Sequence, residues 1–159
     1  MSSLIFHFLL GFPLGLLAEN AGEWVMHRYV LHGLGKDPNS VWNYHWVEHH
    51  HLSRCHGMID PGYREWPIRW NTQGKEFAFL LMVALAHLPL IWVVPGYAAG
   101  MYAALILYYY RHRKAHLDPE WAQRHLPWHY RHHMGAHSDA NWCITWTWCD
   151  RLLGTSRDD

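Results

Sequence analysis

The sequence of 159 residues has little cysteine, and its three cysteines, Cys55, Cys143 and Cys149, form no C-x-x-C pair. This pattern matches neither the disulfide framework of a small secreted domain nor the paired cysteines of a zinc ribbon. Reduced thiols on a cytoplasmic face are the simplest interpretation, because intracellular compartments keep cysteines reduced.

Net charge is also absent. The chain has 13 Lys and Arg against 13 Asp and Glu, so its formal charge at pH 7 is zero with histidine neutral. Nucleic-acid-binding proteins carry a basic patch or a marked excess of positive charge. We therefore expect no nucleic-acid partner.

The sequence also lacks apolar runs of roughly 20 residues, the length that a full transmembrane helix needs. Three shorter runs remain, at residues 4–18, 77–94 and 97–110. No Lys or Arg precedes the first run, which argues against a cleaved secretory signal. Pro95-Gly96 predicts a tight turn, so the second and third runs form a helical hairpin. The eleven Trp and nine Tyr residues suit a membrane–water interface.

The basic residues are distributed unevenly. Residues 1–27 and 76–110 contain no Lys or Arg, whereas residues 28–75 and 111–157 contain all 13 of them. The positive-inside rule places both basic regions on the cytoplasmic side of a membrane. We therefore expect an all-α integral membrane protein, a single domain over residues 1–159, with about three spans and a cytosolic helical cap.

Histidine is the residue in excess. Ten of the sixteen histidines fall in four short groups: HRYVLH, HWVEHH, HRKAH and HYRHH. Imidazole is the commonest metal ligand among side chains, and ten exceed the four ligands of a structural zinc site. Two metal ions, each with several histidine ligands, are the economical interpretation. The candidate ligands are His27, His32, His45, His49, His50, His112, His116, His129, His132 and His133.

Helical geometry suggests how these groups chelate. In HRKAH the histidines are at i and i+4 and can point at one metal, and the three of HYRHH share a face. In HWVEHH, His45 and His49 share a face, while His50 is turned by about 100°. In HRYVLH the i and i+5 histidines lie roughly 140° apart on an ideal α-helix, so this pair is expected to straddle a centre.

Polar residues near the groups are candidates for positioning or catalysis. Glu19, Glu23 and His27 recur every four residues, so Glu23 lies one turn before His27 and can hold its tautomer. Glu19 lies deeper, and an ionisable group at membrane depth is a functional candidate. Further candidates near the last group are His137, Asp139 and Asn141.

The four groups, with an apolar hairpin between the second and third, resemble the fatty acid hydroxylase / sterol desaturase superfamily over roughly residues 19–155. The segment HYRHHMGAHSDANWCITWTWCDRLLGT is similar to the closing pattern of that superfamily. Asn141, Asp150 and Gly154-Thr155 stand at its characteristic positions. This chain departs in having Asn-Trp-Cys where many relatives have Asn-Phe-Gly.

The resemblance implies a helical fold whose cytosolic cap binds two iron ions through the ten histidines. It also implies a monooxygenase that uses O2 to hydroxylate an aliphatic C–H bond of a lipid. Spacing alone leaves the metal open, because imidazole suits iron, zinc and copper, and zinc can replace iron in purified protein. No fused haem or flavin domain is recognisable, so an external ferredoxin, cytochrome or reductase supplies the electrons. The expected location is a bacterial inner membrane, with the metal site on the cytoplasmic side.

A fatty acyl chain is the favoured substrate. The third group has a three-residue spacer, where carotenoid hydroxylases are expected to have four, and the Gly-Thr ending points the same way. Carotenoid ring hydroxylation, desaturation and other oxidations of lipids by a di-iron site remain as alternatives. A membrane haem-binding or metal-binding protein is the non-enzymatic alternative.

Overall fold

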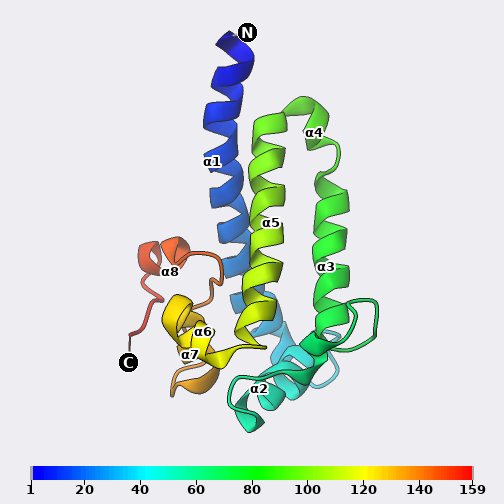
Figure 1. Cartoon of the computed structure of the whole chain (residues 1–159), viewed down its shortest axis with the longest axis vertical. Helices are drawn as coiled ribbons and strands as arrows, with labels where there is room; N and C mark the ends of the chain where they lie inside the picture. The colour runs from blue at the N-terminus through cyan, green and yellow to red at the C-terminus, as the bar shows by residue number, and fades with distance from the viewer. Residues whose placement is uncertain (1, 159) are drawn as a thin grey trace.

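The computed structural model describes residues 2–158, and the predicted all-α class is confirmed, because that part of the chain forms helices and no strands. Its three long helices are α1 (Ser2–Val25), α3 (Thr72–His87) and α5 (Pro95–Ala115), which stand side by side (Figure 1). The short α4 (Leu90–Val93) connects α3 to α5, so the predicted hairpin is present.

The remaining elements are short and gather at the end of the long helices away from the N-terminus (Figure 1). Two are π-helices, Met26–Leu31 and His45–His50, and two are 3-10 turns, Leu34–Lys36 and Pro61–Arg64. Four are α-helices: α2 (His51–Cys55), α6 (Pro119–His125), α7 (Pro127–Met134) and α8 (Trp148–Leu152).

The hairpin differs from its predicted boundaries. Helix α3 ends at His87 instead of continuing to Val94, because Pro89 has no N–H to donate within a helix. Helix α5 begins at Pro95, where proline is well accommodated in the first turn. It then continues to Ala115, five residues beyond the predicted apolar run, and so carries His112.

Helices α1 and α5 pack closely because glycines lie between them. A Cβ atom at Gly15 would collide with the carbonyl oxygen of Tyr97, and one at Gly100 would collide with that of Phe12. Small residues allow two helix backbones to approach in this way. The contact holds α5 beside the helix that carries the first histidine group.

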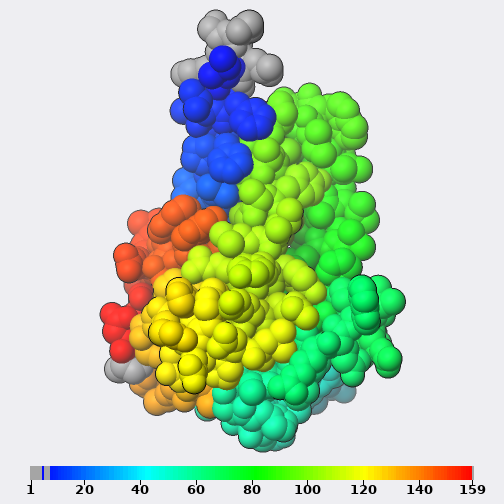
Figure 2. All heavy atoms as spheres, in the orientation of Figure 1, coloured from blue at the N-terminus to red at the C-terminus, as the bar shows by residue number. Residues whose placement is uncertain are grey.

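No helix within residues 2–158 combines the length and the apolar character needed to cross a membrane, so the three predicted spans are not supported. The ends of the long helices are nevertheless apolar and exposed: Leu9 is 68% exposed and Trp92 75% exposed. In Figure 2 these ends project from a broader part formed by the shorter helices.

Candidate metal centre and adjoining pocket

The four histidine groups meet at one end of the long helices, and all ten predicted ligands are buried. The first group sits where α1 continues as a π-helix, and the second forms the other π-helix. The third lies at the C-terminal end of α5 and the fourth on α7. The structure therefore brings together four segments that are far apart in the sequence.

The π-helix changes the expected geometry of the first pair. The His32 N–H donates to the carbonyl oxygen of His27 at 2.9 Å, which is the i to i+5 bond of a π-turn. Residues five apart are then stacked one turn above the other, instead of about 140° apart. The prediction that His27 and His32 straddle a centre is therefore wrong, because both belong to one set of converging side chains.

The same geometry in the second π-helix pairs His45 with His50, not with His49 as an α-helix would. We call the first set group A: its members are His27, His32, His45, His50 and His132. Group B contains His49, His112, His116 and His133. Two pairs of sequence neighbours, His49 with His50 and His132 with His133, are thus divided between the groups.

His129 completes the predicted set on the side of group B. Its Nε2 atom lies 3.2 Å from Nε2 of His116, and its ring centroid lies 4.7 Å from that of His133. The expectation that His129, His132 and His133 share one helical face holds only loosely, since His132 belongs to group A. The pairing of His112 with His116 is as expected.

The donor atoms suit a metal ion in each group. Within a group, one ligand atom from each histidine lies within 4.8 Å of all the others. A metal with nitrogen bonds of about 2 Å requires donors no more than about 4 Å apart, so a small contraction suffices. Several buried ring nitrogens, including Nε2 of His49 and both of His133, have no hydrogen-bond partner among the described residues. Unpaired buried polar atoms are costly, and a bound ion satisfies them.

Main-chain carbonyls orient two histidines of group A. Nδ1 of His27 donates to the Trp142 carbonyl at 2.6 Å, and Nδ1 of His132 donates to that of Ala140 at 2.7 Å. Because a carbonyl can only accept, these neutral rings carry their proton on Nδ1, and Nε2 is left as the ligand atom. The Nε2 atoms of His27 and His45 are 3.2 Å apart.

The C-terminal segment holds the Trp142 carbonyl in place. Buried Asp150 accepts from the N–H groups of Trp142 and Cys143 at 2.9 and 2.8 Å, and from the Thr155 hydroxyl at 2.7 Å. The closing pattern noted in the sequence therefore supports group A through backbone bonds.

Two carboxylates that the sequence reasoning missed orient group B. Nδ1 of His49 donates to Asp60 at 3.0 Å, and Nδ1 of His112 donates to Glu76 at 2.8 Å. The Tyr63 hydroxyl also donates to Glu76. The one signal in the sequence was an acid at the start of an apolar run, at Glu76, and spacing offered no reason to connect it with a histidine 36 residues away.

Burial governs the protonation of these groups. Burial lowers the pKa of most of the clustered imidazoles, that of His27 to about 4, so they are neutral at pH 7 and able to bind metal. Burial raises the pKa of Glu76 to about 8. For Asp60, burial would raise the pKa, but hydrogen bonds from His49 and Gly62 outweigh it and the pKa is lowered.

The predicted positioning role of Glu23 toward His27 is wrong, because His27 is bonded to Trp142. The Glu23 carboxylate instead accepts from the N–H groups of Ile144 and Thr145 at 2.8 and 3.0 Å, and so fastens α1 to the C-terminal segment. Glu19 is buried and contacts no histidine ligand by a described hydrogen bond; it lines the pocket described below.

The other candidates near the last group have different positions. An oxygen of exposed Asp139 lies 3.5 Å from Nδ1 of His32, with no described hydrogen bond between them. Asn141 accepts from the Arg157 N–H at 2.9 Å and donates to its carbonyl, which fixes the chain end. Its φ of 57° lies in the left-handed region, which asparagine tolerates. His137 is exposed at the surface.

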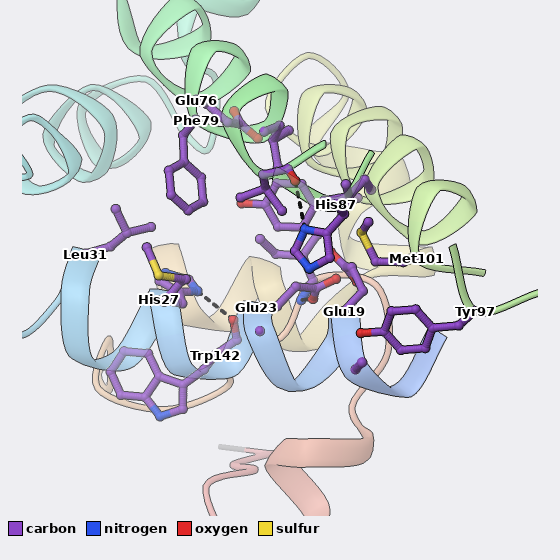
Figure 3. A pocket seen from close by; sticks show the side chains of 18 of the residues that line it. Glu19, Glu23, His27, Leu31, Glu76, Phe79, His87, Tyr97, Met101 and Trp142 are labelled. Atoms are coloured by element: carbon purple, nitrogen blue, oxygen red, sulfur yellow. Dashed lines mark hydrogen bonds between the residues drawn. The ribbon is translucent and has the colours of Figure 1, made fainter. Parts of the chain in front are cut away.

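A pocket of about 210 Å³ lies between α1, α3 and α5 and reaches group A. Most of its lining is apolar, with Phe79, Leu80, Val83, Met101 and Leu105 among the lining residues. Figure 3 shows His27 and Trp142 at one end of the pocket and Tyr97 at the other, with Glu23 and Glu19 between them. Such a cavity fits an alkyl chain whose far end approaches the metal ligands.

Comparison with known proteins agrees with the resemblance seen in the sequence. The model of the fatty acid hydroxylase family matches residues 12–155, so the chain belongs to this family and to the sterol desaturase/fatty acid hydroxylase superfamily. Membership implies an oxygenase or hydroxylase enzyme, and the two histidine groups are compatible with a metal site. No curated protein and no solved structure gave a match.

Proposed function

We propose that the protein hydroxylates an aliphatic C–H bond of a lipid, with a fatty acyl chain favoured, at two iron ions bound by groups A and B. One observation carries the proposal: nine buried histidines converge in two sets, with His129 beside the second, next to an apolar pocket that His27 itself lines. The family match supports the reaction class. The iron ions would supply the activation of O2, with electrons from a separate ferredoxin, cytochrome or reductase.

The chain's own residues would provide position and insulation. His27 and Trp142 form the end of the pocket against which a substrate carbon would rest. The apolar side chains of α3 and α5 would exclude water from the reacting carbon. Asp60 and Glu76 would hold His49 and His112 with Nδ1 protonated, so that Nε2 faces the metal.

We further propose that the apolar ends of α1 and of the α3–α5 hairpin enter a membrane, the inner membrane if the source is bacterial, with the metal end on the cytoplasmic side. Exposed apolar surface of this extent marks a membrane or partner contact. Trp92 and Val93 on α4 are each 75% exposed, and α4 lies at the opposite end of the long helices from groups A and B (Figure 1). A lipid substrate could then pass from the bilayer into the pocket.

Metal analysis with a product assay tests the proposal. The protein is expressed with added iron, its metals are measured by mass spectrometry, and lipid products are measured with O2 and a reductant present. We expect about two metal ions per chain, one for each group, and hydroxylated lipid only when both O2 and reductant are supplied. Full activity in both His49→Ala and His132→Ala would refute it.

The same material separates the alternatives. Supplying carotenoids, fatty acyl lipids and sterols in parallel identifies the substrate class by its product, and a desaturated product would replace hydroxylation. A strong Soret absorption band in the purified protein would favour a haem-binding protein and count against the di-iron site.

A further inference from the structure

The apolar pocket beside group A has two small residues on the wall that α1 provides. Ala18 and Gly22, one turn apart, line it together with Met26, one turn further on. Helix α3 provides another wall, and Figure 3 shows Phe79 of that helix across the pocket from α1. Apart from Ala18, the other apolar residues that line the pocket have larger side chains than Gly22. The pocket is therefore least filled by its own lining at Gly22.

Neither packing nor backbone conformation requires a glycine at position 22. Gly15, on the same helix, is needed because a Cβ atom there would collide with the Tyr97 carbonyl oxygen. A Cβ atom at Gly22 would meet no atom of the described residues within 4 Å. Among the described glycines, those with positive φ are Gly57 and Gly154. Glycine is less favourable than alanine inside a helix, so what it provides at position 22 is open space.

The open space lies on the route to the metal ligands. Gly22 precedes His27 by five residues, which places it roughly 7.5 Å from His27 along α1 at the usual rise of a helix. His27 belongs to group A and lines the same pocket. An alkyl chain that reaches His27 along α1 therefore passes Gly22.

We propose that Gly22 is a specificity-determining residue, whose missing side chain leaves the width in which an alkyl chain lies between α1 and α3 beside group A. The inference rests on the proposed function and names the position that controls access to the same site. A larger side chain at position 22 would occupy the space of several methylene groups of the lipid. The fold would tolerate it, because no described atom is close enough to collide with its Cβ atom.

Binding without turnover tests the proposal separately from catalysis. Iron-loaded protein in detergent, without O2 or reductant, is incubated with radiolabelled methyl palmitate, and the retained label gives the affinity. Comparing each variant with the unchanged protein cancels the partition of the lipid into detergent. We expect Gly22→Leu to lower the affinity about tenfold or more, because each displaced methylene group costs up to about fourfold. Gly22→Ala adds one methyl group, so its loss should be less than about fourfold.

A matched control and a second variant make the comparison decisive. Ala21→Leu is the control, because Ala21 is the preceding residue of α1, is exposed and does not line the pocket. It should leave the affinity unchanged. Gly22→Val replaces Gly22→Leu if circular dichroism and metal content show that the leucine variant does not fold. Affinity for methyl palmitate that is unchanged in the folded variants at position 22, or lowered equally by Ala21→Leu, would overturn the proposal.

Thermal unfolding distinguishes open space from a role in packing. Gly22→Ala should raise the melting temperature by about 2–4 °C, because alanine is the better helix former. Gly15→Ala should lower it, because the added Cβ atom collides with α5. A lower melting temperature in Gly22→Ala would show that packing requires this glycine and would overturn the proposal.

The outcomes also separate this inference from the proposed function. Binding that Gly22→Leu weakens, without hydroxylation when O2 and reductant are added to the unchanged protein, would refute the proposed function and support the role of Gly22. Hydroxylation by the unchanged protein, with equal binding in Gly22→Leu, would do the reverse. If the unchanged protein retains no methyl palmitate, both are refuted for fatty acyl chains.

Discussion

Groups A and B hold similar numbers of imidazoles but differ in the buried carboxyl groups behind their rings, although His116 of group B also donates to a main-chain carbonyl, that of Met58, at 2.9 Å. His27 and His132 of group A donate to main-chain carbonyls, whereas His49 and His112 of group B donate to the carboxylates of Asp60 and Glu76. An ionised carboxylate raises the basicity of an imidazole ligand more than a neutral carbonyl does. Asp60, whose pKa is lowered, does so at pH 7, and Glu76, whose pKa burial raises to about 8, does so once it is ionised. Group B is therefore expected to bind its metal more tightly. Group A is the one that lines the apolar pocket, through His27.

The largest expected effect is a loss of bound metal when either of two adjacent histidines, His49 and His50, is replaced, because they belong to different groups. His49→Ala should lower the metal content from about two toward one by emptying group B, and His50→Ala should do the same to group A. The double variant should lose both metals, because the losses are independent. His51→Ala is the matched control, since this adjacent histidine is exposed and belongs to neither group. Equal metal content in the single and double variants would contradict the assignment of His49 and His50 to different groups.

Acid should destabilise the metal-free protein strongly. The pKa of His27 is about 4 in the folded protein, because burial lowers it, against 6.5 for an exposed histidine, so the unfolded chain binds more protons between these pH values. Stability is then present above pH 6.5 and is lost as pH falls toward 4, by roughly 3 kcal/mol for His27 alone. Denaturant unfolding of the metal-free protein at several pH values measures this. A free energy of unfolding that stays constant from pH 7 to pH 4.5 would contradict it.

Removing the carboxylates behind group B should weaken that group selectively. Asp60→Asn and Glu76→Gln are each expected to reduce metal affinity about 10- to 100-fold, the usual effect of losing such a partner. Competition with a chelator gives the affinity of each metal. Group A serves as the internal control. If these variants instead weaken the metal ion that the unchanged protein binds less tightly, group B is the weaker site and the proposed order of affinities is reversed.

The smallest effect is expected at Asp139, the carboxylate near group A. It lies 3.5 Å from His32, is 63% exposed and also pairs with Lys36 at 3.2 Å. Exposed charge pairs contribute at most about 1 kcal/mol, so Asp139→Asn should lower the affinity of group A less than fivefold. A loss as large as that of Asp60→Asn, measured in the same titration, would show that group A also depends on a carboxylate.

Much of the site could be predicted from the spacing of histidines in the sequence, and the prediction failed at particular residues. The ten histidines were identified because ligands on helices recur at short intervals. Their division was predicted incorrectly at His27, His32, His45 and His50, because an α-helical period was assumed where the chain forms π-turns. Asp60 and Glu76 were missed because their bonds to His49 and His112 depend on distant segments meeting.

The amino-acid sequence by itself determined the helical class, the hairpin and the identity of the clustered histidines, because periodicity, turn residues and ligand type are local properties. Only the tertiary structure decided which histidines share a group, which acceptors hold their rings, and that Gly22 and Phe79 line one cavity. These features require segments separated by tens of residues to pack against one another. The burial that results also sets the protonation of Glu76 and the clustered imidazoles, which local sequence does not specify.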